Sequence, residues 1–233
     1  MLIVLNHKMN LKIDEAKEYE EAIRDMDVIV MPQTPFLGLF TNEAKYILGS
    51  QCVSEYNAPG GVSPEALASM NCKYVIVGHA ERRIVRKEDC EIVARKIIEV
   101  INNEMIPIMC IGENIEQRDN DQTLEILENQ ISNVFGMIEG CLGEVMIAYE
   151  PVWSIGTDQT PSNDEIAGIL EFIKIICKDK YKLNPTLFYG GSVNASNIEE
   201  IKQINNLDGI IVGTASLDLK QVNQIYNVIK ESL

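Results

Sequence analysis

The sequence has 233 residues, of which 46% are hydrophobic, so the chain is long enough to bury one large core. Its 35 acidic and 20 basic residues give a formal net charge of −15, which argues against nucleic acid and anionic membranes as general partners. If the substrate is an anion, its site must create a local positive field within a negative molecule.

The cysteines and histidines do not form a metal-binding pattern. The six cysteines lie 18 or more residues apart, no C-x-x-C occurs, and His7 and His79 are distant in sequence. We therefore expect buried reduced thiols, with no metal site and no disulfide framework. The apolar run before Asn6 is too short for a signal peptide, and no apolar run approaches membrane-spanning length. These features predict a soluble, cytoplasmic protein without a membrane partner.

Short apolar runs rich in β-branched residues recur along the chain. Most are apolar throughout, which is typical of parallel strands covered on both faces. The predicted strands are Leu2–Asn6, Val28–Met31, Leu48–Cys52, Tyr74–Gly78, Ile106–Ile111, Val145–Tyr149, Thr186–Tyr189 and Gly209–Val212.

Between the strands the apolar residues recur with helical spacing. Residues 124–138, 166–177 and 222–229 each carry apolar side chains three or four positions apart, which predicts amphipathic helices packed on a sheet. Ser63, before a proline, and Ser162, before Asn-Asp-Glu, are typical helix N-caps.

The number of units decides the architecture. Eight strand–helix units repeat about every 30 residues, which is the length of one βαβ unit. Eight such units predict closure into a single-domain (β/α)8 barrel over residues 1–233. The alternative, an open doubly wound sheet, usually has a glycine-rich fingerprint after its first strand, and "LNHKMN" has no glycine.

Polar residues gather where the predicted strands end, which is the rim that carries the active site of such barrels. Taken singly, a lysine there is usually a solvated charge, and glycines usually mark a turn. Their convergence on one rim is what indicates a site. The strand ends are Asn6-His7-Lys8, Gly78-His79-Ala80-Glu81, Cys110-Ile111-Gly112-Glu113, Glu150-Pro151-Val152-Trp153, Gly190-Gly191-Ser192 and Gly213-Thr214-Ala215-Ser216.

The residue types favour proton transfer at a carbon next to a carbonyl. The Glu150 carboxylate can remove the proton, while the His79 imidazole and the Lys8 ammonium stabilise the resulting oxyanion. The glycine-rich turns after the last two strands can direct backbone N–H groups at a phosphate. The sequence has no nucleophile elbow, which argues against a serine or cysteine hydrolase. A glycosidase needs a second inward carboxylate, and Glu81 and Glu113 are poor candidates because each adjoins a charged or hydrogen-bonding partner.

Five motifs carry a resemblance to a known family. In chain order they are "VIVGHAERR" (75–83), "CIGE" (110–113), "AYEPVWSIGT" (148–157), "YGGSV" (189–193) and "DGIIVGTASL" (208–217). With these motifs, essentially the whole chain resembles the triosephosphate isomerases. The resemblance implies a homodimeric (β/α)8 enzyme of glycolysis and gluconeogenesis. It would interconvert dihydroxyacetone phosphate and D-glyceraldehyde 3-phosphate through an enediolate, without cofactor or metal.

The resemblance also assigns roles at the reacting carbons. It makes Glu150 the base and His79, as neutral imidazole, the electrophile. Lys8 becomes the cation beside the carbonyl and the phosphate, and Asn6 a hydrogen-bond donor next to it.

The remaining roles concern the phosphate and the loop after Glu150. The resemblance places Glu81 as the residue that orients Lys8 or the neighbouring arginines, and Glu113 as the anchor of Trp153. Residues 151–153 then form the rigid hinge of a lid over the base. The phosphate would rest on the backbone N–H groups of Gly156, Ser192, Gly213 and Thr214.

Some positions depart from the family pattern. Ala80 replaces a serine that holds the resting base, and His7 replaces a tryptophan at a packing position. Thr214 replaces a glycine, which narrows the backbone conformations open to that turn. The loop "SEYNAPGGVSP" (54–64) is short and has a proline, Pro59, where a threonine is usual. In the family that loop normally interlocks two subunits, so these changes fall at the expected dimer interface.

A further departure lies at the end of the lid. In the family, the backbone N–H at the position of Pro161 bonds the hydroxyl of the tyrosine at Tyr189. Proline has no N–H, so we expect a stiff hinge there. We also expect Tyr189→Phe to change little the loss of the enediolate phosphate as methylglyoxal, because the bond it would break is already absent.

Two alternatives remain open from the sequence. One is a related isomerase acting on a four-carbon ketose phosphate. The other is a barrel that binds phosphorylated metabolites without catalysis, although a binder has no use for the base Glu150.

Overall fold

Eight parallel strands form a closed barrel in which each strand pairs with its neighbour in chain order and β8 pairs with β1. The computed structural model describes residues 1–40, 43–139, 144–157 and 159–231. The (β/α)8 prediction is therefore confirmed. The strands are β1 Leu2–Asn6, β2 Ile29–Met31, β3 Ile47–Ser50, β4 Tyr74–Val77, β5 Ile106–Ile111, β6 Met146–Tyr149, β7 Leu187–Tyr189 and β8 Gly209–Val212.

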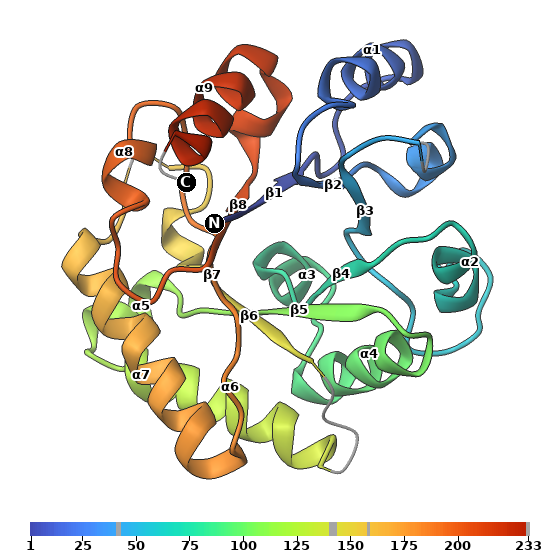
Figure 1. Ribbon diagram of the computed structural model, residues 1–233. Helices are drawn as coiled ribbons and strands as arrows, with labels where there is room; N and C mark the ends of the chain where they lie inside the picture. The colour runs from blue at the N-terminus through green and yellow to red at the C-terminus, as the bar shows by residue number, and fades with distance from the viewer. Residues whose placement is uncertain (41–42, 140–143, 158, 232–233) are drawn as a thin grey trace.

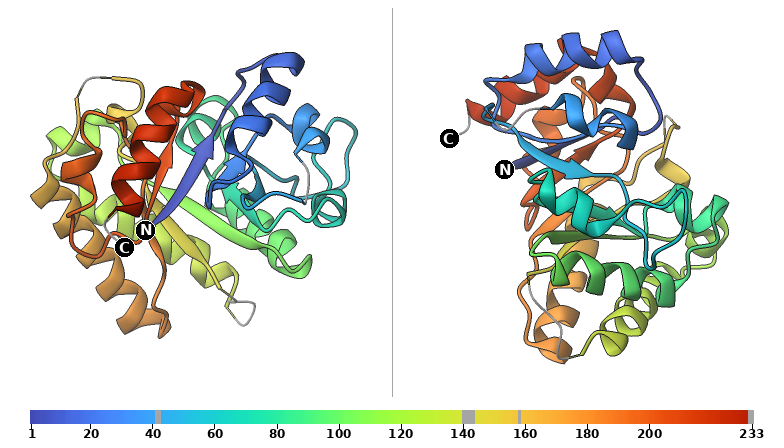
Figure 2. Two further views of the ribbon diagram at one scale, coloured as in Figure 1. Left: turned by 45° about the horizontal axis from the view of Figure 1, so that its top comes forward. Right: turned by 90° about the vertical axis from the view of Figure 1, so that its right-hand side faces the viewer.

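Helical segments surround the strands, and Figures 1 and 2 show them on the outside of the barrel. Strands β1 and β8, from opposite ends of the sequence, lie side by side and close the ring. The α-helices are α1 Ile13–Ile23, α2 Pro64–Ser69, α3 Ala80–Val85, α4 Cys90–Asn102, α5 Ile115–Asp119, α6 Thr123–Met137, α7 Asn163–Tyr181, α8 Ile198–Ile201 and α9 Leu219–Lys230. The 3₁₀ turns are η1 Thr34–Leu39, η2 Val152–Ser154 and η3 Thr214–Leu217.

The barrel interior is filled by a compact apolar cluster. The strands that supply this cluster also direct the site residues inward. Val4 and Ala148 belong to this cluster and are fully buried. Side chains two positions apart on a strand point to the same face. Asn6 and Glu150, two residues beyond Val4 and Ala148, therefore point inward at the carboxyl end of the barrel.

The strand and helix boundaries follow the sequence predictions with small shifts. β3 ends at Ser50, two residues before the predicted end, and β6 begins one residue after Val145. The two predicted caps are confirmed, because Ser63 Oγ accepts from Ala66 N and Ser162 forms a capping box with Glu165. Cys141, one of the six cysteines, lies outside the described residues.

Thr214 fits its turn without a strained backbone. It is the first residue of η3 and has a negative φ. The turn therefore does not need the glycine that the family pattern has at this position.

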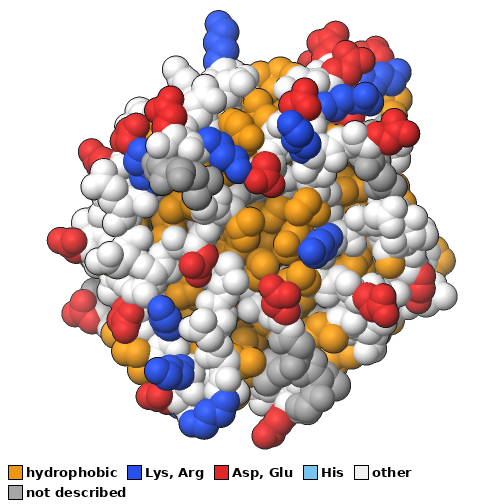
Figure 3. Space-filling model, viewed as in Figure 1, with side chains coloured by type: hydrophobic (Ala, Val, Ile, Leu, Met, Phe, Trp, Pro, Cys, Tyr) orange, Lys and Arg blue, Asp and Glu red, His pale blue; other side chains and the backbone are white. Residues whose placement is uncertain are grey.

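The charged side chains lie mainly around the periphery of the face seen in Figure 3, over the surrounding helices. Hydrophobic side chains reach the surface near the middle of that face, where the strands converge in Figure 1. On this face the acidic and basic groups are interspersed, so the net charge of −15 is not concentrated in one acidic patch.

Candidate active site

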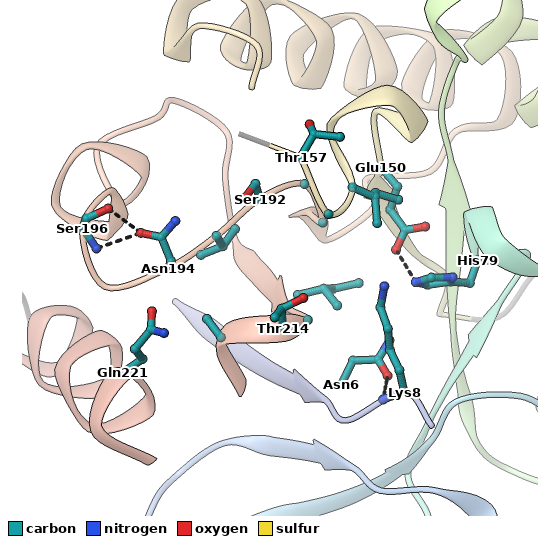
Figure 4. A pocket seen from close by; sticks show the side chains of 18 residues that line it. Asn6, Lys8, His79, Glu150, Thr157, Ser192, Asn194, Ser196, Thr214 and Gln221 are labelled. Carbon is teal, nitrogen blue, oxygen red and sulfur yellow. Dashed lines mark hydrogen bonds and ion pairs between the residues drawn. The ribbon is translucent and has the colours of Figure 1, made fainter. Parts of the chain in front are cut away.

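One cavity of about 370 Å³ opens at the carboxyl ends of the strands. Figure 4 shows Lys8, His79 and Glu150 pointing into one end of it. The sequence-predicted catalytic and substrate-binding residues all line this cavity: Asn6, Lys8, His79, Glu150, Gly156, Ser192, Gly213 and Thr214.

Glu150 is held in place by backbone groups. Its side chain is almost fully buried, and Oε2 accepts a hydrogen bond from the Ala80 N–H at 3.1 Å. Two glycines make room for it. A Cβ at Gly112 would lie 1.9 Å from the Glu150 carbonyl oxygen, and one at Gly190 would lie 2.8 Å from Glu150 Cγ. The missing serine hydroxyl at position 80 is thus replaced, in the free protein, by the backbone N–H of the same residue.

His79 presents one defined nitrogen to the cavity. It is the N-cap of α3, and its Nδ1 accepts a hydrogen bond from Glu81 N at 3.2 Å. A nitrogen that accepts carries no proton, so the neutral ring has its proton on Nε2. His79 Nε2 stands 3.7 Å from Glu150 Oε1. The imidazole N–H and the carboxylate therefore face the same point in the cavity.

Lys8 supplies the positive charge. Its Nζ lies 2.5 Å from Glu81 Oε1, and its φ of 51° is a left-handed conformation that non-glycine residues seldom adopt. Two hydrogen bonds support this backbone: Lys8 N donates to Asn6 Oδ1 at 3.1 Å, and Gln51 Nε2 donates to Lys8 O at 2.8 Å. Partial burial raises the pKa of Glu81, but the bond and charge of Lys8 bring it below its ordinary value. Glu81 is thus a carboxylate paired with the Lys8 ammonium, in the contact that the resemblance implied.

The opposite wall of the cavity offers backbone donors. Among the residues that the structure describes, the N–H groups of Gly156 and Ser192 have no hydrogen-bond acceptor. Gly156 has a φ of 71°, which glycine adopts without strain. Gly213 and Thr214 lie at the start of η3, so their N–H groups have no acceptor within that turn and can donate to an anion in the cavity.

A buried carboxylate anchors the segment after Glu150. Trp153 Nε1 donates to Glu113 Oε1 at 2.8 Å, and Tyr149 Oη donates to the same oxygen at 3.1 Å. The Arg118 guanidinium covers the Trp153 ring at 4.2 Å. The indole is thus held on two sides, in the contact with Glu113 that the resemblance implied.

Several residues near the site were not predicted from the sequence. Gln51 follows β3, so its position at a strand end was the signal that could have found it. The far end of the cavity is lined by Asn194, Ser196 and Gln221, well separated from Glu150 in Figure 4. Asn194 and Ser196 follow the predicted turn after β7, whereas nothing in the helical pattern singles out Gln221.

Two structural findings concern metals and membranes. Within the described ranges, no group of three or more His, Cys, Asp or Glu side chains could hold a metal ion. None of the helices in those ranges is both long and apolar enough to cross a bilayer.

The fold and the rim define a (β/α)8 barrel enzyme with a carboxylate–imidazole pair opposite a wall of backbone N–H groups. The family model described as triosephosphate isomerase matches residues 1–229. The triosephosphate isomerase of Legionella pneumophila (strain Paris) is 34% identical over 98% of this chain and 98% of its own length. That of Wolbachia pipientis wMel is 35% identical over 99% and 93%, and that of Alkaliphilus metalliredigens (strain QYMF) 34% over 93% and 94%. The chain belongs to the triosephosphate isomerase family.

Proposed function

We propose that the chain interconverts dihydroxyacetone phosphate and D-glyceraldehyde 3-phosphate. The observation that carries the proposal is the convergence of Glu150, His79 Nε2 and Lys8 on one cavity of a chain of this family. The activity is that of an aldose–ketose isomerase. The family membership does not favour a four-carbon substrate or a non-catalytic binding role.

The residues act in sequence on the substrate carbons. Glu150 removes a proton from the carbon next to the carbonyl, and the C–H electron pair forms the enediolate. His79 Nε2–H and the Lys8 ammonium donate to the developing oxyanion, where preorganised donors contribute most. The proton of the neighbouring hydroxyl passes to this oxyanion through His79 Nε2, which gives up its own proton and takes the other. Return of the carbon-bound proton from the Glu150 carboxyl group to the neighbouring carbon then gives the isomer. One carbon is oxidised as the other is reduced, so the balance needs no external redox partner.

The phosphate group of the substrate would be bound by backbone N–H groups and Lys8. The N–H groups of Gly156, Ser192, Gly213 and Thr214 surround one part of the cavity and, with Lys8, provide a local positive field in an acidic chain. Binding energy from this group is available to orient the reacting carbons against Glu150. Asn6, beside Lys8 at the end of β1, supplies a further donor.

A coupled assay tests the function directly. Glyceraldehyde 3-phosphate and a four-carbon ketose phosphate would be offered to the purified protein in parallel. We expect turnover of the three-carbon substrate with at least a hundredfold higher kcat/KM. Preference for the longer sugar, or no turnover of either, contradicts the proposal.

We also propose a homodimer. The support is a set of exposed apolar side chains in the segments that follow β1, β3 and β4. Its members are Met9 and Tyr56 in loops and Ile84 and Val85 at the end of α3. A second copy of the chain packed on these segments would bury apolar surface that is otherwise in water. Sedimentation at micromolar protein should show a dimer, and a fully active monomer contradicts this proposal.

The proposed location is the cytoplasm, where glycolysis and gluconeogenesis supply and consume triose phosphates. Cell fractionation with activity measured in each fraction tests it. Activity that sediments with membranes contradicts it.

A further inference from the structure

Gln130 of α6 forms two hydrogen bonds with the main chain at the end of β5. Its Nε2 donates to the Gly112 carbonyl oxygen at 2.9 Å, and the Gly112 N–H donates to its Oε1 at 2.9 Å. The side-chain amide therefore pairs with Gly112 as a peptide group of a neighbouring strand does. Gly112 is the first residue after β5 and is buried, so leaving its N–H and carbonyl oxygen without partners would cost free energy.

Gln130 takes the place of a strand that has already ended. The pairing between β4 and β5 reaches only as far as Met109. Beyond that residue, Arg83 Nη2 donates to Cys110 O at 3.2 Å. The amide of Gln130 then provides the partner for Gly112. These two side chains extend the hydrogen bonding of β5 past the end of β4, up to the rim where the cavity opens.

The same short segment also contacts the main chain of Glu150. The Glu150 N–H donates to Ile111 O at 2.8 Å. One residue further on, a Cβ at Gly112 would overlap the Glu150 carbonyl oxygen, so the two main chains are in direct contact there. Gly112 is therefore bonded to Gln130 and packed against Glu150, and a displacement of Gly112 must displace the main chain that carries the base.

The packing of α6 fixes the position of Gln130. Leu127, Ile131 and Val134 of this helix are fully buried in the core. Gln130 is three residues after Leu127 and four before Val134, so it lies beside this buried stripe on the helix surface. Its side chain is half-buried, and its amide meets Gly112 without a change in the helix.

We propose that Gln130 is a positioning residue that holds Gly112 against Glu150 and so fixes where the Glu150 carboxylate stands over the substrate. Gln130 is not among the described residues that line the cavity, so it acts through the main chain of Gly112. The inference rests on the proposed function, because it takes Glu150 as the base.

Gln130→Met removes both hydrogen bonds and keeps a side chain of similar length and helix propensity. We expect kcat to fall about tenfold while KM stays within about twofold, because the base is displaced and the phosphate contacts are not. A normal kcat, or a rise in KM as large as the fall in kcat, overturns the proposal.

Gln130→Glu adds a test by pH. A carboxylate can accept from the Gly112 N–H but cannot donate to Gly112 O, whereas a protonated carboxyl group can do both. Burial beside a carbonyl oxygen also favours the protonated form. The kcat of Gln130→Glu relative to the unmodified protein should therefore be lowest at about pH 8 and recover severalfold toward about pH 5, where the carboxyl group gains its proton. The same ratio for Gln130→Met should not change with pH, and equal pH profiles for the two variants contradict the proposal.

Gln203 provides a matched control, because its Nε2 also donates to a backbone oxygen, Glu199 O, at 2.9 Å. Gln203→Met should leave kcat and KM unchanged. Hydrogen exchange of the Glu150 N–H, followed by NMR, needs no turnover. It should be at least about tenfold faster in Gln130→Met and unchanged in Gln203→Met.

The two readouts separate this inference from the proposed function. Unchanged exchange of the Glu150 N–H in Gln130→Met overturns the inference, whether or not the unmodified protein acts on triose phosphates. Faster exchange in a protein that shows no isomerase activity supports the positioning of Glu150 by Gln130 and contradicts only the proposed function.

Discussion

The carboxylate of Glu150 accepts a hydrogen bond from the backbone N–H of Ala80, with Oε2 3.1 Å from the nitrogen. Ala80 is the first residue of α3, and N–H groups of a first helical turn have no acceptor inside the helix. This N–H is thus free to hold the base. The relationship suggests a substitution that removes one donor and leaves the helix intact.

Ala80→Pro should lower kcat about tenfold or more with little change in KM, because a hydrogen bond to a charged group contributes about 1.5–3 kcal/mol. Proline suits the first position of a helix, and His79, with φ −50° and ψ 141°, already has the extended conformation that a following proline requires. Ala80→Ser keeps the N–H and serves as the control. Steady-state kinetics of both variants check the prediction, and equal kcat values contradict it.

Shortening the base should separate binding from chemistry. Glu150→Asp retracts the carboxylate by one methylene, and a misplacement of about 1 Å can reduce the rate about a hundredfold. We expect kcat to fall by that order while KM stays within a few-fold, because the phosphate contacts are unaffected. A near-normal kcat means that another group removes the proton.

Gly190 should be sensitive to a single added carbon. A Cβ there would lie 2.8 Å from Glu150 Cγ, so Gly190→Ala must displace the base or the end of β7. We expect at least a tenfold loss of kcat. Gly168→Ala in α7 is the control, because nothing lies within 4 Å of its added Cβ and alanine favours a helix by about 0.5–1 kcal/mol. Full activity in Gly190→Ala would show that the base tolerates the displacement.

The strand ends were predictable from sequence, and so was the clustering of Asn6, Lys8, His79 and Glu150. Parallel strands bring their carboxyl ends to one rim, and a period of two decides which side chains point inward. The contact of the Arg118 guanidinium with the Trp153 ring was not predictable in this way. It depends on how η2 packs on a helix 35 residues away in sequence, and that distance carries no periodic signal. Gln51 likewise acts through the backbone of Lys8, which only the folded loops bring within reach.

Inorganic phosphate should compete with the substrate. The neutral N–H groups of Gly156 and Ser192 and the single charge of Lys8 attract it against the −15 of the chain. Added salt screens exposed charges, so the phosphate inhibition constant should rise between 0.01 and 0.15 M salt, over which the Debye length falls from about 30 to about 8 Å. Inhibition assays across this range test the site. Noncompetitive inhibition would place the anion elsewhere.

His7 occupies a buried aromatic pocket. Its ring contacts Tyr19 edge-on, with centroids 4.3 Å apart, and lies 6.2 Å from Phe40. Nε2 has no hydrogen-bond partner within the described residues. Burial disfavours the charged ring and lowers the pKa of His7 from 6.5 to about 4. The position at which the resemblance expects tryptophan thus holds an imidazole whose protonation in the folded protein costs free energy.

The burial of His7 predicts that the stability of the protein falls on acidification, and that His7→Phe makes this fall smaller. Between pH 6.5 and 4 the unfolded chain binds a proton at His7 that the folded chain does not, so the free energy of unfolding falls as the pH drops through that window. The lowered pKa of His7 corresponds to a loss of about 3 kcal/mol in the free energy of unfolding. This loss is reached near pH 4 and is absent above pH 6.5. His7→Phe keeps an aromatic ring and should lose less stability on acidification. Urea unfolding of both proteins at pH 7.5 and 4.5, at one protein concentration, measures the difference. Carboxylate titration destabilises both proteins alike and cancels, so equal losses would mean that His7 is solvated or paired when charged.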